Sequence, residues 1–423
     1  MIRALPRAAL MLCAASALAA QSAAPRPVPR VVDVDPLHQI GQNVTITLLT
    51  MGSGKEVWEL FGHNALWIHD NVTGRDTVFN WGVFDFHQPR FIQRFLKGEM
   101  LYAMGGDPLS QQLAVYRYLN RTVAAQELDL SVAQRDSILH QIQWYAQPEN
   151  INYRYDYYRD NCATRIRDIM DNAIGGQMHT KAGSPTGTTY RWQSLRLMQG
   201  DKPIMLGVDI GLGRPADRDL TQWETMFLPR PLHDFVATLQ VSDSAGATHP
   251  LVKRESILFR ASRAPEPDAP PGLVPWLIGA GLIVAGLFAW IGSAAMAGGR
   301  GARVVASTLI GLWAIAAGIL GLLLTLLWTV TDHVFAHANE NLLLFNPLWL
   351  VLAIVAIASL ARGRPGTWFR WSATGLAALA TLALVAHVAQ LSAQDNLAVI
   401  GLALPPALAI AWVARRPSQS TPR

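Results

Sequence analysis

The chain has 423 residues, of which 51% are hydrophobic and 15% charged, and its mean hydropathy is +0.19. This composition is too apolar for one soluble domain, and the apolar residues concentrate after residue 272. The formal net charge of +5 does not indicate nucleic-acid binding, because much of the positive excess lies in short loops between apolar stretches. We therefore expect a globular domain followed by a membrane domain, and no nucleic acid as a partner.

Residues 1–20 have the pattern of a secretory signal segment. Arg3 and Arg7 precede an apolar run that ends in small residues suited to cleavage. Cys13 lies in this run without the small residues that a lipoprotein signal places before its cysteine, so we expect it to be inert. An uncleaved anchor is the alternative. Cleavage would leave Cys162 as the only cysteine, and no internal disulfide is then possible.

Residues 63–84 have the pattern of a β-hairpin. Two strand-like runs are separated by a turn rich in Asp, Asn and Gly. The first run opens with His63, and the second contains Asn80 among large apolar residues. A lone histidine on a strand is usually structural, but a histidine and a polar third group in one domain with a reactive cysteine match thiol catalysis. His69 and His87 are weaker candidates for the same roles.

Two helical patterns lie between this hairpin and Cys162. The first is an apolar stripe at helical spacing, best explained by core packing, with contact to a lipid surface as the alternative. The stripe consists of Phe91, Ile92, Phe95 and Leu96, followed by Met100, Leu101 and Tyr102. The second pattern covers residues 131–147, where Ser131 and Gln134 predict a capping box.

The stretch 159–168 predicts the start of a helix at Cys162. Asn161 is a good N-cap, and apolar residues recur at helical spacing after it. The first-turn N–H groups and the positive end of the helix dipole favour a thiolate and could also stabilise an oxyanion. Most lone cysteines are buried and structural, but the charged flanks, which include Asp160 and Arg165, favour a reactive thiol here.

The end of the globular part contains two breaks in the pattern. Residues 219–236 predict a helix that stops at Pro229. Residues 238–259 contain the two arms of a hairpin that would close the domain. A Pro-rich linker follows at residues 261–272, so we expect one globular domain over residues 40–260.

Five apolar stretches follow the linker and predict a membrane domain over residues 273–414. They lie at about 273–295, 304–330, 347–361, 371–391 and 397–414. Arginines follow the first, third and fifth stretches, whereas residues 331–346 and 392–396 contain no Lys or Arg. The positive-inside rule therefore places the arginine loops in the cytoplasm and the globular domain on the other side.

The external loop at residues 331–346 is rich in hydrogen-bonding side chains, including His333, Asn339 and Asn341. It lies on the same side of the membrane as Cys162, so it is a candidate for contact with substrate or lipid head groups. A solvated loop is the plainer alternative. A metal site is conceivable, but nothing in the sequence fixes the spacing of ligands, so we assign no metal ligands and expect no cofactor.

The order of these residues resembles a known superfamily. His63 precedes Cys162, as in the circularly permuted branch of the papain-like and NlpC-like hydrolases that includes lecithin retinol acyltransferase. In that branch a histidine opens a strand, a polar residue follows on the next strand, and an Asn-Cys pair opens a helix. The resemblance implies an α+β, permuted papain-like (NlpC-like) periplasmic domain and an all-α membrane domain of about five transmembrane helices.

The chain is more closely similar to the bacterial Lnb-type lipoprotein N-acyltransferases. The shared motifs are Phe61-Gly62-His63, Phe79-Asn80-Trp81-Gly82-Val83-Phe84-Asp85-Phe86, Asp160-Asn161-Cys162-Ala163-Thr164-Arg165, Met226-Phe227-Leu228-Pro229, Asn339-Glu340-Asn341-Leu342-Leu343 and Asn346-Pro347. The resemblance implies a multi-pass protein of the bacterial inner membrane with its N-terminal domain in the periplasm. It also implies transfer of a fatty acyl chain from a membrane phospholipid, through a thioester on Cys162, to the N-terminal amine of diacylglyceryl-cysteine lipoproteins.

The resemblance implies a role for each candidate residue. Cys162 would be the nucleophile, His63 its general base and Asn80 the third member, with Asn161, Asp160 and Arg165 in support. Two other functions stay open from the sequence. A periplasmic NlpC-like cysteine peptidase or amidase would use the same pair on peptidoglycan, but the sequence contains no wall-binding repeat. A lipid-binding membrane scaffold would need no reactive thiol.

Overall fold

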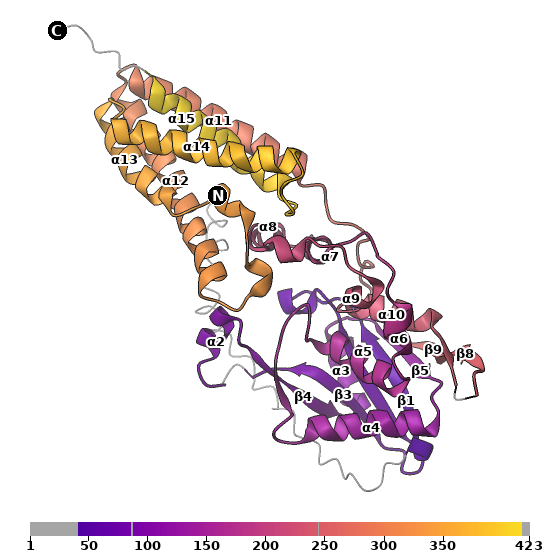
Figure 1. Cartoon of the computed structure of the whole chain (residues 1–423). Helices are drawn as coiled ribbons and strands as arrows, with labels where there is room; N and C mark the ends of the chain where they lie inside the picture. The colour runs from indigo at the N-terminus through magenta and orange to yellow at the C-terminus, as the bar shows by residue number, and fades with distance from the viewer. Residues whose placement is uncertain (1–40, 86–87, 244, 417–423) are drawn as a thin grey trace, which may run out of the picture. The chain divides into compact units, whose positions relative to one another are not determined.

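The computed structural model describes residues 41–85, 88–243 and 245–416 (Figure 1). The expected signal segment at residues 1–20, with Cys13, and the candidate His87 lie outside the described residues. The chain divides into two compact units. The first comprises Met1–Tyr190 and Asp219–Asp268, and the second comprises Arg191–Arg218 and Ala269–Arg423.

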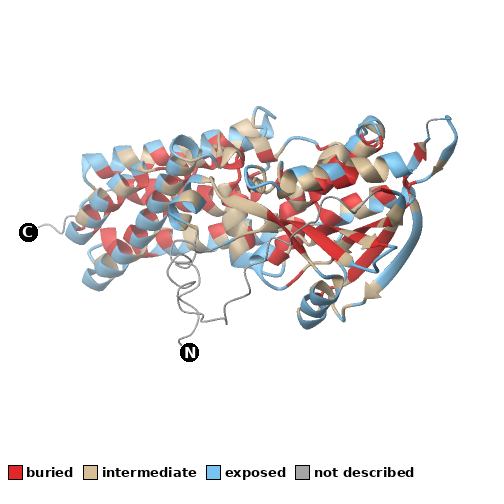
Figure 2. Cartoon of the chain, turned by 90° about the horizontal axis from the view of Figure 1, so that it is seen from below, coloured by how far each residue is buried: buried red, intermediate tan, exposed pale blue. Residues whose placement is uncertain are grey.

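A seven-stranded antiparallel sheet forms the centre of the first unit, in the order β6-β4-β3-β2-β1-β5-β9. Its strands are β1 (Val44–Met51), β2 (His63–Asp70), β3 (Asp76–Val83), β4 (Leu101–Asp107), β5 (Val123–Leu128), β6 (Asn152–Arg154) and β9 (Val252–Phe259). The predicted hairpin is confirmed as β2 and β3, with Ala65 paired to Asn80. The central strands are almost wholly buried, as Figure 2 shows in red.

Helices cover both faces of this sheet. On one face, α4 (Val132–Ala146) and α5 (Cys162–Ala173) pack their apolar side chains against Leu66, Phe79 and Trp81. On the other face, α3 (Leu109–Tyr118) packs through Tyr116. The predicted capping box at the start of α4 is confirmed. The remaining short helices of this unit are η1 (Gly41–Asn43), η2 (Val57–Glu59), α2 (Phe91–Lys97), α6 (Gln177–Lys181), α9 (Gln222–Thr225) and α10 (Pro229–Thr238).

The prediction that Pro229 ends a helix is wrong, because Pro229 begins α10. Proline is favoured at the first position of a helix, where its missing N–H would have had no partner and its fixed φ already suits the helix. The chain before it forms only the single turn of α9, which Thr221 and Glu224 close with a capping box.

The prediction of a closing hairpin is wrong in its pairing. The short strands β7 (Gln240–Ser242) and β8 (Thr248–Pro250) pair with each other, whereas β9 joins the main sheet beside β5. The side chains of β5 are mostly buried, so an unpaired edge there would leave backbone N–H and C=O groups without partners. Pairing with β9 satisfies those groups.

The second unit contains five helices that are long and apolar enough to cross a membrane, with the third span counted from Glu340 to Arg362. The helices are α11 (Val274–Met296), α12 (Arg300–Thr329), α13 (Leu348–Arg362), α14 (Thr367–Val388) and α15 (Leu397–Arg415). The five predicted apolar spans are therefore confirmed. Small residues let α11 and α15 approach closely, since a Cβ added to Gly281 would lie 2.2 Å from the carbonyl oxygen of Gly401.

Residues 191–218, which we expected within the 40–260 domain, belong to the second unit. They contain most of α7 (Tyr190–Met198), all of α8 (Lys202–Gly211) and η3 (Arg214–Ala216). The loop between α12 and α13, which contains η4 (Val334–Ala336) and η5 (Glu340–Leu343), hydrogen-bonds to this segment. The chain therefore passes from one unit to the other at three places.

Candidate active site

His63 is the first residue of β2 and follows a glycine that the backbone requires. Gly62 has a φ of +80°, and a Cβ at this position would lie 2.9 Å from the carbonyl oxygen of Met51. Both the backbone conformation and the close approach therefore favour glycine. This explains the Gly62-His63 pair, because the backbone turn at Gly62 places His63 at the start of β2.

Asn80 on β3 holds the imidazole of His63. The Nε2 of His63 lies 2.9 Å from the Oδ1 of Asn80, whose own Nδ2 donates to the carbonyl oxygen of Val78. That second bond fixes which end of the amide faces the ring, so Nε2–H is the donor to Oδ1. The other ring nitrogen, Nδ1, is then left without its proton and can accept one from a thiol.

Cys162 is the first residue of α5, as the sequence predicted. The side chain of Asn161 caps the helix, because its Oδ1 accepts from the N–H groups of Ala163 (2.9 Å) and Thr164 (3.0 Å). The Nδ2 of Asn161 donates to the carbonyl oxygen of Phe227 at 3.0 Å. The shared motif around Phe227 thus secures the turn that carries the cysteine.

The pKa of the Cys162 thiol is lowered although the side chain is half-buried. Burial raises its pKa, but the charge and hydrogen bond of the His63 side chain and the N–H groups of Asn64 and Ala163 outweigh burial and leave the pKa lowered. The lowered pKa makes the Cys162 thiol easier to deprotonate than an ordinary cysteine. Sequence reasoning missed Asn64, which contributes through its backbone and carries no side-chain signal for that role.

Gly82 borders both members of this pair. It has a φ of +136° and lies in a bulge between Trp81 and Val83, at the end of β3. A Cβ placed on it would meet the Cε1 of His63 at 3.5 Å and the Cβ of Cys162 at 3.9 Å. Sequence reasoning missed this residue, although an isolated glycine within a strand pattern is a signal for a bulge or a close approach.

The first turn of α5 offers fewer free N–H groups than the sequence suggested. Ala163 and Thr164 both donate to the capping oxygen of Asn161. The N–H of Cys162 itself donates to no acceptor in the described part of the chain. An oxyanion beside the sulfur would therefore find its helix donor in the N–H of Cys162.

Three aromatic side chains lie near the same thiol. The rings of Tyr102 and Tyr155 stack with their centroids 4.1 Å apart, and the ring centroid of Phe84 lies 5.2 Å from that of Tyr102. Cys162 packs against the same apolar cluster. Burial, and then the charge of a Cys162 thiolate, raise the pKa of Tyr102 to about 12 and that of Tyr155 well above its ordinary value. Both phenols are therefore neutral, and the rings of Phe84, Tyr102 and Tyr155 form an aromatic wall near the sulfur.

Asp160 and Arg165 brace the turn before Cys162 without touching the thiol. The guanidinium of Arg165 donates two hydrogen bonds to the carboxylate of Asp160, from Nε to Oδ1 at 2.6 Å and from Nη2 to Oδ2 at 2.7 Å. It also lies 3.7 Å from the ring centroid of Tyr153. A bidentate pair combined with a cation–π contact fixes the direction of the guanidinium and connects Asp160 to Tyr153 beside the turn.

The loop residues proposed from the sequence lie in the second unit and are engaged there. Asn339 and Asn341, 1% and 0% exposed, both donate to the carbonyl oxygen of Ile210 at the end of α8, at 2.8 and 3.0 Å. The solvated-loop alternative therefore does not describe these two side chains. His333 is half-buried, and its N–H donates to the Oγ1 of Thr331 at 3.3 Å.

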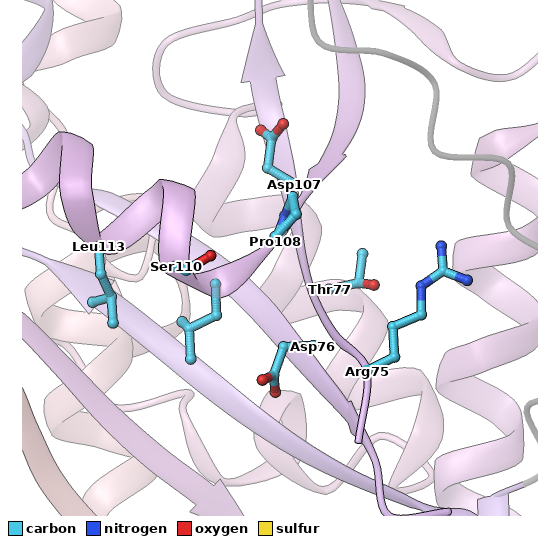
Figure 3. Close-up of a pocket in the computed structure, with 8 residues that line it drawn as sticks. Arg75, Asp76, Thr77, Asp107, Pro108, Ser110 and Leu113 are labelled. Carbon is cyan, nitrogen blue, oxygen red and sulfur yellow. The ribbon is translucent and has the colours of Figure 1, made fainter. Parts of the chain in front are cut away.

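Two further features of the described residues lie apart from this constellation. His69, the weaker candidate, bonds through Nδ1 to Asp76 at 2.8 Å, near the other end of β2. A pocket of about 480 Å³ also adjoins Asp76 and is lined by Asp107 and the start of α3 (Figure 3), without Cys162 or His63. Within the described ranges, no three His, Cys, Asp or Glu side chains are grouped so that they could hold a metal ion.

Comparison with known families accounts for both units. Residues 39–195 match the family model of the Lnb N-terminal periplasmic domain, and residues 280–411 match that of the Lnb transmembrane domain. No significant match was found among curated proteins or among solved structures. The periplasmic-domain match precedes the transmembrane-domain match in the chain, as the sequence motifs predicted. The chain therefore belongs to the Lnb family, as a multi-pass membrane protein whose N-terminal domain is periplasmic.

Proposed function

We propose that the protein is a lipoprotein N-acyltransferase of the bacterial inner membrane that forms an acyl thioester on Cys162. The observation that carries the proposal is the Asn80–His63–Cys162 constellation inside an Lnb periplasmic domain. Membership of the family suggests an enzyme, and a lowered thiol pKa beside an oriented imidazole is what nucleophilic thiol catalysis requires. The acyl donor is a membrane phospholipid, and the acceptor is a diacylated lipoprotein.

In the first half-reaction, the sulfur of Cys162 attacks an ester carbonyl of the phospholipid. The thiol proton moves to Nδ1 of His63, and the new S–C bond places a negative charge on the carbonyl oxygen. The N–H of Cys162 is the helix donor available to that oxygen. The tetrahedral intermediate collapses as the C–O bond breaks, and His63 returns the proton to the departing lysophospholipid.

In the second half-reaction, the N-terminal amine of the lipoprotein cysteine attacks the thioester. A C–N bond forms, the amine loses a proton to His63, and the C–S bond breaks. The thiolate of Cys162 then regains its proton or stays paired with the imidazolium. Asn80 keeps the ring in one orientation through both steps, so the same nitrogen faces the thiol each time.

Two observations favour this reaction over the alternatives. A peptidoglycan peptidase or amidase would act on a polymer outside the bilayer, for which five apolar helices give no advantage. Tethering to the membrane instead raises the effective concentration of substrates that stay in the bilayer. A lipid-binding scaffold has no use for a thiol whose pKa is lowered by a histidine.

Mass spectrometry of Cys162 tests the proposal. The full chain is reconstituted in vesicles that contain a phospholipid with an isotope-labelled acyl chain, without an acceptor, and then digested. We expect the labelled acyl group on the Cys162 peptide in the wild type and none in Cys162→Ala. A muropeptide on Cys162 after incubation with peptidoglycan fragments, with no acyl adduct from lipid, would instead identify the hydrolase.

A further inference from the structure

The short helix α2 carries an apolar surface that the described fold leaves exposed. None of its residues is buried, and Ile92, Phe95 and Leu96 are 48%, 51% and 60% exposed. We expected this stripe to pack in the core. The structure contradicts that expectation for the residues of α2, whereas Tyr102, at the end of the same stripe, packs against the core. Most of the stability of a helix in a protein comes from packing its apolar face, and a helix of seven residues is marginal in water by itself.

The charges of α2 identify the kind of surface that would cover it. Arg90, Arg94 and Lys97 lie along or just before the helix, which has no acidic residue in its first turn. No carboxylate among the described residues forms an ion pair with any of the three. An amphipathic helix that combines cations with aromatic and aliphatic side chains is typical of the interface of an anionic bilayer. The same chain contains five helices that are long and apolar enough to cross a bilayer.

The position of α2 links this surface to the candidate active site. The helix lies in the connection between β3, which carries Asn80 and Gly82, and β4, which contains Tyr102 (Figure 1). Gln88 fastens the start of this connection by donating to the carbonyl oxygen of Leu101 at 3.2 Å. In the chain, α2 is therefore flanked by the strand ends that carry the Gly82 bulge and Tyr102.

We propose that α2 inserts shallowly into the anionic lipid surface and so holds the edge of the active site at the bilayer. The exposed apolar side chains would enter the head-group region while the three cations meet lipid phosphates. This proposal deepens the proposed function and rests on it for one point, that the acyl donor is a phospholipid. A phospholipid ester would then have only a short way to move out of the bilayer to reach Cys162.

Fluorescence from a probe on α2 tests the insertion directly. Leu96→Cys is made in the full chain with Cys13→Ala and Cys162→Ala, labelled with an environment-sensitive dye and reconstituted in phosphatidylcholine vesicles with or without phosphatidylglycerol. The matched control is Val72→Cys, at a turn of the same sheet and 72% exposed. We expect blue-shifted emission and quenching by spin labels near the head groups at position 96 only, and more of both with phosphatidylglycerol.

Neutralising the cations adds a quantitative test. Each of Arg90→Gln, Arg94→Gln and Lys97→Gln should lower the partition of the position-96 probe into anionic vesicles by about fivefold. Equal, water-like emission at positions 96 and 72 in every vesicle would overturn the proposal. Insertion that does not depend on the cations or on phosphatidylglycerol would overturn its electrostatic part.

A functional comparison separates this proposal from the proposed function. Leu96→Ser, with Cys162 intact, should slow acylation of Cys162 by vesicle phospholipid, while Leu96→Phe should retain it and both should keep wild-type alkylation of Cys162 by a soluble reagent. Unchanged acylation in Leu96→Ser would contradict a role in lipid presentation. A wild type that inserts α2 but never acylates Cys162 would instead refute the acyltransferase and leave the insertion standing.

Discussion

Buried asparagines do different work in the two units. Asn80, 6% exposed, bonds to the imidazole of His63 in the first unit. Asn341, 0% exposed, bonds in the second unit to the carbonyl oxygen of Ile210 and accepts from the side chain of Asn396. The sequence proposed both residues for function, Asn80 as a polar residue among large apolar ones and Asn341 as part of an external loop rich in hydrogen-bonding side chains. Only the first has a titratable partner.

The comparison gives a rule for judging buried amides in this protein. An amide that holds a titratable ring sets a tautomer and a direction, so its loss changes chemistry. An amide that holds the last carbonyls of a helix replaces hydrogen bonds that the helix cannot make, so its loss changes stability. Substitutions in the two units should therefore separate an effect on chemistry from an effect on stability.

The largest effect is expected at the nucleophile. Cys162→Ala should abolish acyl transfer and leave the unfolding midpoint close to that of the wild type, because the side chain is small and half-buried. Cys162→Ser should retain little activity, since a hydroxyl is far less ionised than this thiol. Transfer to a diacylglyceryl peptide in liposomes is the measurement. Activity in the alanine variant would end the thiol mechanism.

The next largest effect is expected at His63. His63→Ala removes the group that receives the thiol proton, so transfer should fall by about 10²–10⁴-fold. The same change should leave the midpoint of thermal unfolding nearly unaltered if the histidine serves chemistry. A large loss of stability with a small loss of activity would make His63 a structural residue.

Asn80→Ala should cost less, about tenfold in transfer, because it removes one hydrogen bond that orients the ring. The measurement is the rate of transfer beside the rate of alkylation of Cys162. We expect both to fall together, since a misdirected imidazole supports the thiolate poorly. A loss equal to that of His63→Ala would reverse the roles assigned here, and no loss at all would remove Asn80 from the site.

The pH dependence of alkylation is expected to follow the lowered pKa of Cys162. The rate should reach half its plateau at a lower pH in the folded protein than in the unfolded chain. In His63→Ala the pH at which alkylation reaches half its plateau should rise, because burial raises the pKa of Cys162 and the histidine no longer lowers it. The lowered pKa also means that the thiolate stabilises the fold above the pKa of the unfolded thiol, and that this contribution is lost as the pH falls through the folded value.

The smallest effect on chemistry is expected in the second unit. Asn341→Ala removes one donor to the carbonyl oxygen of Ile210 and leaves the amide of Asn396 without its acceptor, at a cost of about 1–3 kcal/mol. The unfolding midpoint should fall while alkylation of Cys162 is unchanged.

His333→Ala is a suitable companion variant, because that residue is only half-buried. Loss of transfer in His333→Ala without loss of stability would support contact with substrate.

Local patterns in the sequence determined much of this protein. Asn161 before Cys162 predicted a capped helix start, and the alternation after His63 predicted the strand pair that brings Asn80 to it. The five apolar spans followed from length and composition. These features depend on residues a few positions apart, where periodicity, capping and turn chemistry act directly.

Only the tertiary structure decided the features that depend on distant partners. β9 pairs with β5 because a buried strand needs its second edge satisfied, and Gly82 reaches the site because a bulge redirects the end of β3. Asn339 binds α8 across 129 residues of sequence. Burial forces every polar backbone group to find a partner, and which partner it finds is set by the packing of the whole unit rather than by neighbouring residues.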